Sequence, residues 1–182
     1  VLAAAHEQGI IHRDIKPANL YACRYGREVD FMKVLDFGLV MNVSPGAVAG
    51  GSLPVAGGTP GFMSPEQVLG DEAVDARSDI YALGCVAYWL LTGTPVFSGE
   101  TSLNTMMMQV SVTPEPPSHR SGRAFPPELE ALVLACLAKE PAARPQSVDE
   151  MAGSLDAVPL AGRWDQVEAN RWWASVRPGN AP

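Results

Sequence analysis

Hydrophobic residues recur at helical spacing through most of the chain after residue 66. Residues 79–92 are apolar on nearly every side, which predicts a central buried helix that ends at Gly93. Shorter helices are predicted over residues 101–110, over residues 129–137 and from the expected N-cap Ser147 onward. This part of the chain therefore predicts a helical lobe.

The first third of the chain has a different pattern. Residues 1–9 read as the last turns of a helix that Gly9 closes. Two β-like runs, "NLYACRY" and "FMKVLDF", follow, and "GREVD" between them predicts a hairpin turn that pivots on Gly26. The expected fold class is therefore mainly α with a small β-hairpin (α+β).

Two further segments stand apart from these elements. Residues 37–65 contain no charged side chain but hold seven glycines and four prolines, so they predict a long loop of functional importance. Residues 159–182 form a Trp-rich tail in which apolar positions recur on one helical side, at Trp164, Val167, Trp172 and Val176. The tail could pack back on the lobe or bind another protein, and the sequence leaves both open.

Composition narrows the range of partners and compartments. The net charge of −7, from 13 basic and 20 acidic residues, argues against a nucleic-acid-binding protein. The longest apolar run, residues 81–91, is too short to span a bilayer, so no membrane segment is expected in this chain. Three widely spaced cysteines match neither a metal site nor a disulfide framework, which predicts a cytoplasmic location.

The candidate chemistry is densest in "HRDIKPANL", which follows the first helix. Phosphoryl transfer to a hydroxyl needs a carboxylate, a cation near the moving group and oxygen ligands for magnesium. Asp14, Lys16 and Asn19 could supply all three from one loop that Pro17 stiffens. The alternative is a solvated turn, but nine consecutive residues that fit the pattern favour a catalytic loop.

Two later motifs complete the pattern. "DFG" at residues 36–38 offers a carboxylate for magnesium, and "GGTPGFMSPEQ" ends the charge-free segment. With these motifs in order, residues 1–158 resemble the C-terminal lobe of a eukaryotic-type serine/threonine protein kinase, of the bacterial branch. "SDIYALGCVAYWLLTGTPVF" and "CLAKEPAARP" resemble the central helix of that lobe and the segment with its late arginine.

The resemblance implies roles for individual residues. Asp14 would be the catalytic base and Lys16 would steady the transferred phosphoryl group, while Thr59 would hydrogen-bond to this pair. Asn19 and Asp36 would hold the magnesium that bridges the phosphates of ATP. Lys16 and Thr59 together favour Ser/Thr over Tyr as the acceptor. Tyr21 would lie beneath the adenine ring, where the family usually has a smaller apolar residue.

A scaffold around these groups is also implied. Glu66 is expected to pair with Arg144, and Asp79 to accept hydrogen bonds from the backbone of the catalytic loop. His12 and Phe37 are expected to stack in an apolar column. His6 and His119 match no partner pattern and receive no role.

The charge-free segment carries the remaining expectations. Gly38 would let the backbone turn sharply after "DF". Ser44 and Ser52 are candidate phosphorylation sites, and Arg13 would receive the phosphate. An unmodified loop is an equal alternative.

The largest departure from the family pattern concerns the ATP-binding half. The Gly-rich loop and strand lysine of kinases have no counterpart in the sequence. We therefore expect the N-terminal lobe of the same kinase to be missing, and the isolated chain to be inactive toward protein Ser/Thr substrates. A non-catalytic pseudokinase or interaction module is the main alternative, and a small-molecule phosphotransferase is a weaker one.

Overall fold

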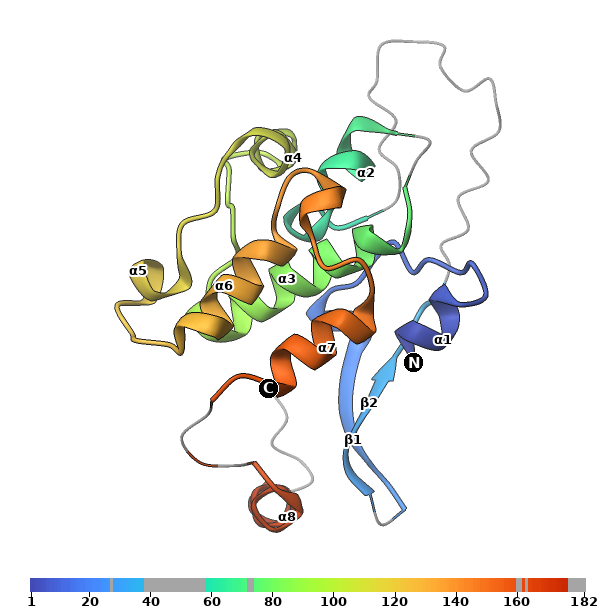
Figure 1. Cartoon of the computed structure of the whole chain (residues 1–182), viewed down its shortest axis with the longest axis vertical. Coiled ribbons are helices and arrows are strands. Elements are labelled where there is room, and N and C mark those ends of the chain that lie inside the picture. Colours follow the sequence, from blue (N-terminus) through green and yellow to red (C-terminus); the bar gives the residue numbers. More distant parts are fainter. Residues whose placement is uncertain (27, 38–57, 72–73, 160–161, 163, 177–182) are drawn as a thin grey trace.

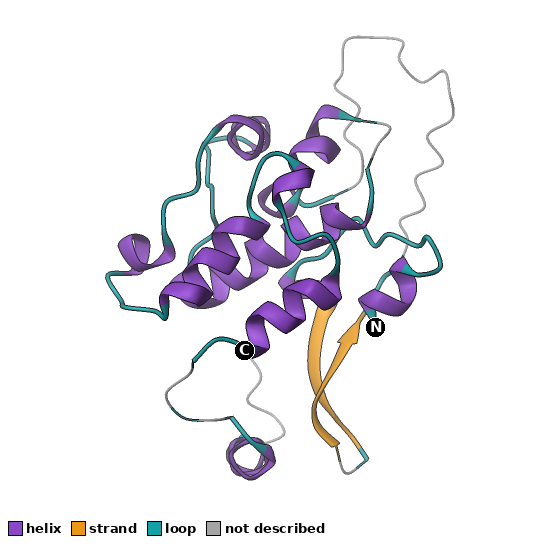
Figure 2. Cartoon of the chain, in the orientation of Figure 1, coloured by secondary structure: helices purple, strands orange, loops and turns teal. Residues whose placement is uncertain are grey.

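The computed structural model describes residues 1–26, 28–37, 58–71, 74–159, 162 and 164–176. A group of helices lies beside a single antiparallel hairpin (Figure 1), and Figure 2 separates the helices from the two strands by colour. The helices are α1 (Leu2–His6), α2 (Pro65–Leu69), α3 (Ala76–Thr92), α4 (Ser102–Ser111), α5 (Pro117–Ser121), α6 (Pro127–Cys136), α7 (Val148–Asp156) and α8 (Gln166–Ser175). The strands are β1 (Leu20–Tyr25) and β2 (Glu28–Val34), and 3₁₀ turns cover Pro17–Asn19, Pro60–Phe62 and Pro141–Ala143. The predicted mainly α fold with a small hairpin is confirmed.

Helix α3 forms the centre of the lobe. It begins three residues before the predicted start, because the Asp75 side chain accepts a hydrogen bond from Arg77 N and caps the helix. It ends at Gly93, as predicted, with a left-handed φ of 73°. The main hydrophobic cluster joins α3 to α6 and to the segment after α3, through Tyr81, Cys85, Tyr88, Val96, Phe97, Val133 and Leu137.

The last turn of α3 departs from the prediction of an all-round buried helix. The side chain of Leu90 is 70% exposed and that of Trp89 is 37% exposed. The residues on either side of them, Tyr88 and Leu91, do pack on the main cluster, so one side of this turn is covered while Trp89 and Leu90 stay accessible. No helix in the described part of the chain is long and apolar enough to cross a membrane.

The hairpin is attached to the helices at one end. Leu20 pairs with Val34 in the register, and both side chains pack against the cluster of Ile15, Ala82 and Val86. The predicted turn "GREVD" is too long, because residues from Glu28 onward already belong to β2. Tyr25 pairs with Glu28 across a tight turn at Gly26, whose φ is 61°.

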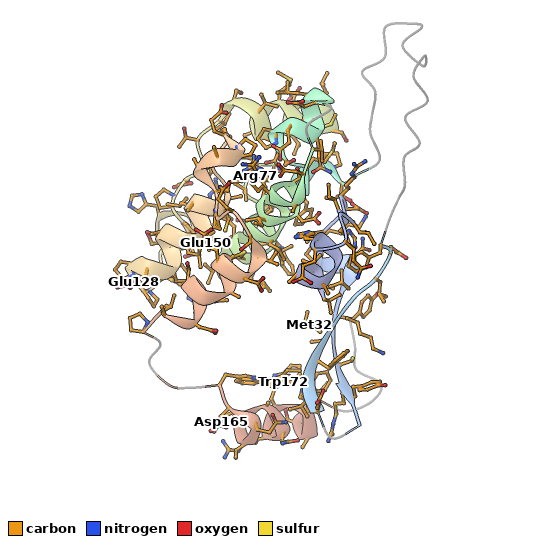
Figure 3. The ribbon with its side chains drawn as sticks, turned by 45° about the vertical axis from the view of Figure 1, so that its right-hand side comes forward. Met32, Arg77, Glu128, Glu150, Asp165 and Trp172 are labelled. Atoms are coloured by element: carbon orange, nitrogen blue, oxygen red, sulfur yellow. The ribbon has the colours of Figure 1, made fainter. Side chains whose placement is uncertain are left out.

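The Trp-rich tail folds back on the hairpin. Helix α8 packs against β2, and Figure 3 shows Trp172 on α8 beside the far end of the strands. The indole nitrogens of Trp164 and Trp173 donate hydrogen bonds to the two carboxylate oxygens of Asp30, at 2.6 and 2.5 Å. Trp164 nevertheless stays 59% exposed, because its polar indole edge makes the contact, and Trp172, which meets the Trp173 ring edge-on, stays 48% exposed.

Replacing Asp30 by Asn is expected to loosen α8. The two indole hydrogen bonds hold the pKa of Asp30 below its ordinary value, and an amide offers them only one acceptor oxygen. Amide exchange across residues 166–175 should therefore speed up in D30N, and acidification of the parent through the lowered pKa of Asp30 should have the same effect. The exposed Asp156, at the end of α7, gives the control D156N, and equal exchange in both variants would contradict the role of Asp30.

Candidate active site

The loop between α1 and β1 is fixed to the core by one buried carboxylate. Asp79, fully buried on α3, accepts hydrogen bonds from the backbone nitrogens of His12 and Arg13, each at 2.9 Å. These are the contacts that the sequence led us to expect. Arg13 has a left-handed φ of 66°, which costs about 1–3 kcal/mol for a residue with a side chain. The loop keeps this conformation because Asp79 and Gln67 bind the backbone on both sides of Arg13.

His6 is a further partner of Asp79 that the sequence did not reveal. Its Nε2 atom lies 2.8 Å from Asp79 Oδ2, which also accepts the bond from His12 N. The two residues are 73 positions apart, so no local pattern links them. His6 therefore ties the end of α1 to the same carboxylate that holds the loop.

Four predicted site residues meet at the Asp14 carboxylate, which is only 8% exposed. Lys16 Nζ donates to Asp14 Oδ2 at 2.6 Å and to Thr59 Oγ1 at 3.0 Å. Thr59 donates to Asp14 Oδ1 at 3.3 Å, and Asn19 Nδ2 donates to Asp14 Oδ2 at the same distance. The structure thus brings together a carboxylate, a cation, an amide and a hydroxyl, the last from a segment 45 residues away from Asp14.

His12 joins this cluster to the end of β2. Its Nδ1 accepts a hydrogen bond from Asp14 N at 3.2 Å, so Nε2 carries the proton that is donated to Leu35 O at 2.8 Å. The ring also meets Phe37 edge-on, with 4.8 Å between the ring centroids. The predicted contact of His12 with Phe37 is present, and it fixes the backbone on both sides of Asp36, whose φ is 58°.

The predicted pair of Glu66 and Arg144 lies behind the site. Arg144 donates from Nη1 to Glu66 Oε1 at 2.7 Å and from Nη2 to Glu66 Oε2 at 2.8 Å, and both residues are buried. Ser78 Oγ adds a bond to Glu66 Oε1 at 2.6 Å. Burial alone would raise the pKa of Glu66, but the bonds from Arg144 and Ser78 hold it below its ordinary value.

Gln67, next to Glu66, is a second residue that the sequence analysis missed. Its Nε2 atom donates to Arg13 O at 2.8 Å, while its Oε1 atom accepts from Ser64 N and closes a capping box on α2. The "SPEQ" signal for a capped helix was present in the sequence, but not the reach of Gln67 to the catalytic loop. Gly38, Ser44 and Ser52 lie outside the described residues.

Comparison with known proteins decides the family. The model of the protein kinase domain matches residues 1–154. The chain belongs to the protein kinase family. The serine/threonine kinase PknB of Mycolicibacterium smegmatis is 42% identical over 151 residues, which cover 83% of this chain and 23% of the relative.

Other bacterial kinases are similar to the same extent. A probable serine/threonine kinase PknB of Corynebacterium glutamicum is 43% identical over 157 residues, or 85% of this chain and 24% of the relative. The serine/threonine kinase pkn3 of Myxococcus xanthus is 40% identical over 161 residues, which cover 86% of this chain and 29% of the relative. The chain therefore spans about a quarter of the length of these curated relatives. The resemblance to bacterial serine/threonine kinases is confirmed.

Two side chains of the site, Asn19 and Asp36, carry oxygen atoms that could bind a metal ion. Both side-chain hydrogen bonds of Asn19 found within the described residues use Nδ2, which leaves Oδ1 as a possible ligand. Asp36 follows directly after Leu35, the residue that His12 holds. The described ranges contain no cluster of three His, Cys, Asp or Glu side chains that could hold a metal unaided. These residues therefore fit a magnesium ion whose remaining ligands come from a nucleotide.

The predicted adenine-floor residue is Tyr21, on β1 of the hairpin. Tyr21 pairs with Lys33 and is 52% exposed, while its neighbour Leu20 points to the cluster on α3. Side chains of successive strand residues alternate between faces, so Tyr21 is available to a ligand on the face away from α3. This placement is compatible with contact to a base.

Proposed function

We propose that residues 1–158 are the catalytic C-terminal lobe of a kinase that transfers the γ-phosphoryl group of ATP to Ser or Thr hydroxyls of proteins. The observation that carries this proposal is the cluster of Asp14, Lys16, Asn19 and Thr59 around one carboxylate. A structural ion pair alone would not need the amide and the hydroxyl in the same cluster. Residues 159–182 are then a separate tail, of which Trp164 and helix α8 contact the hairpin.

In this mechanism Asp14 orients the substrate hydroxyl and accepts its proton. Among the residues that the structure describes, its Oδ1 atom accepts only the long 3.3 Å hydrogen bond from Thr59, so a substrate hydroxyl can approach it there. Lys16, held 2.6 Å from Oδ2, places a positive charge beside the transferred group. Thr59 binds both residues and keeps the lysine from swinging out of the site.

We propose ATP and Mg²⁺ as the cofactors. The magnesium ion, when bound, neutralises charge on the phosphates that develops during transfer. Asn19 and Asp36 would hold this ion, and Tyr21 would contact the adenine ring of ATP. The charge-free segment before Thr59 would then carry the phosphorylation candidates Ser44 and Ser52, and Arg13 would be the cation that receives the phosphate.

Two partners complete the proposal. An N-terminal lobe of the same kinase supplies the Gly-rich loop and the strand lysine, and a protein with an accessible Ser or Thr is the substrate. A cytoplasmic location is supported by the three free cysteines, of which Cys85 and Cys136 are buried. Burial raises the pKa of the Cys136 thiol to about 12, so this group stays uncharged and inert at neutral pH.

The purified 182-residue chain is expected to show no transfer of phosphate from radiolabelled ATP to a generic Ser/Thr protein substrate. Its sequence supplies the base and two magnesium ligands but contains neither the Gly-rich loop nor the strand lysine that kinases use to bind the phosphates. A polypeptide that joins the chain to a kinase N-terminal lobe should phosphorylate Ser and Thr but not Tyr in the same assay. Activity of the isolated chain would contradict the interpretation that the chain holds only the C-terminal half of the active site.

The competing interpretation is a non-catalytic interaction module of kinase fold. The exposed Tyr21 in place of a small adenine-floor residue favours it. The retention of Asp14, Lys16, Asn19 and Asp36 opposes it, because a module without activity needs none of them. Nucleotide binding without phosphate transfer, in the polypeptide with both lobes, would decide for the module.

A further inference from the structure

Gln109 is a fully buried polar residue that the catalytic cluster does not use. It lies on α4, and its Nε2 atom donates a hydrogen bond to Pro60 O at 3.2 Å. Its Oε1 atom accepts a bond from the Tyr81 hydroxyl at 2.6 Å, and its backbone carbonyl accepts one from Lys139 Nζ at 2.7 Å. One glutamine thus connects the 3₁₀ turn Pro60–Phe62 to α3 and to the segment after α6.

The turn that Gln109 holds is the one that positions Thr59. Thr59 precedes the turn, and its carbonyl accepts the bond from Phe62 N at 2.8 Å that closes it. The Phe62 side chain packs against two of the hydrophobic clusters around α3. The Gln109 contact falls one residue after Thr59, so it restricts the backbone that brings the threonine hydroxyl to Lys16.

Lys139 completes the network from the other side. Its ammonium group lies 4.5 Å from the ring centroid of Phe97 and 3.4 Å from the Tyr81 hydroxyl. The ionisable groups that face it are Tyr81 and Cys85 on α3 and Arg144 after α6, and its hydrogen bonds in the described structure include none to a carboxylate. Burial of this cation lowers the pKa of Lys139 to about 8.

We propose that Gln109 and Lys139 are positioning residues that hold the Pro60 turn in place for the protein substrate, without contributing to nucleotide binding. The inference rests on the proposed kinase function, because it assigns the turn to the substrate side of that site. The geometry separates the two sides: the network reaches Thr59 through Pro60, whereas Asn19, Tyr21 and Asp36 lie on or beside the hairpin.

The first test measures the turn directly in the 182-residue chain and needs no activity. Gln109→Glu keeps an acceptor for the Tyr81 hydroxyl and gains a charge near Lys139, but it removes the donor to Pro60. Amide exchange of residues 58–64 should become roughly tenfold faster, as expected for the loss of one buried hydrogen bond, while exchange in α3 stays unchanged. Gln109→Met, which keeps the shape and removes both polar atoms, serves if the glutamate variant does not fold. Unchanged exchange at residues 58–64 in the folded variant would overturn the proposal.

The second test uses a kinase polypeptide that contains this chain and an N-terminal lobe. Gln109→Glu and Lys139→Met should each raise KM for a Ser/Thr peptide about three- to tenfold, with KM for ATP unchanged. Equal effects on both KM values, or an effect on KM for ATP alone, would show a general structural role and refute the assignment. If the parent polypeptide has no activity, the proposed function fails, while the exchange test still decides the network.

The pH profile gives a readout that packing alone would not produce. KM for the peptide should rise in the parent as pH passes about 8, because neutral Lys139 binds the Gln109 carbonyl more weakly. Lys139→Met should have the raised KM at every pH, and Lys139→Arg, which stays charged, should keep the low KM without the step. A step that persists in Lys139→Arg would assign the titration to another group and contradict the role of Lys139.

Discussion

Replacing Asp14 by Asn is expected to lower the turnover number about 10²–10⁴-fold in a kinase polypeptide that contains this chain, the usual range for loss of a general base. An amide cannot accept the hydroxyl proton. It also presents NH₂ to Lys16 or to Thr59, which both donate to the Asp14 carboxylate in the parent. KM for ATP should change little, because Asn19 and Asp36 are retained. Steady-state kinetics with a Ser/Thr peptide measure both quantities.

The matched control for this variant is D149N. Asp149 is exposed in the first turn of α7, so the same chemical change there removes one surface charge and leaves the site intact. Turnover in D149N should equal that of the parent. Near-parental turnover in D14N would refute the assignment of Asp14 as the base.

The second large effect is expected on stability. Removing one partner of the Glu66–Arg144 pair, by Glu66→Gln or Arg144→Met, should lower the free energy of unfolding by about 3–5 kcal/mol, since the other charge is left buried without its partner. Arg144 also donates to three backbone carbonyls, those of Arg77, Ala138 and Lys139. The double variant should lose less than the sum of the single losses, because no charge is then left unpaired. Urea unfolding of the 182-residue chain measures the loss of unfolding free energy in the two single variants and in the double variant.

An exposed ion pair supplies the contrast. Arg120 and Glu115 are separated by 2.8 Å but are 37% and 46% exposed, so Glu115→Gln should cost less than about 1 kcal/mol. Acid provides an independent check on the buried pair. Because the pKa of Glu66 is lowered in the folded chain, its contribution is present above the ordinary carboxyl pKa and is lost as pH falls through the folded pKa. The loss of stability that protonation of Glu66 causes should be absent in Glu66→Gln. If the variant lost the same stability in acid as the parent, another group would be responsible.

Residues close together in the sequence were the easiest part of the site to predict. Asp14, Lys16 and Asn19 lie in six consecutive positions, so a single loop must bring them together whatever the rest of the fold does. Thr59, Glu66 and Arg144 lie far apart in the chain and were placed only through the resemblance to kinases. The elements were predicted well where a cap or a glycine marks a boundary, as at Gly93 and Ser147.

The contacts that were missed depend on tertiary packing. His6, Gln67 and Gln109 each bind a partner from a distant segment, and nothing in the neighbouring sequence indicates that partner. These long-range bonds exist only because the fold brings α1 to Asp79 on α3, α2 to the loop at Arg13, and α4 to the Pro60 turn. The docking of the tail on Asp30 was equally hidden, since an apolar stripe cannot reveal that indole nitrogens make the contact.

The single carboxylate of Asp79 has a consequence for the dynamics of the loop. It accepts hydrogen bonds from the His12 and Arg13 backbones and lies in contact with the His6 ring, so the loop cannot move away without leaving a buried charge on α3 unsolvated. The loop and α3 should consequently open as one cooperative unit, at close to the full cost of global unfolding. The loop from His12 to Asn19, which has no helix or strand of its own before Pro17, would thus share the opening free energy of the innermost helix.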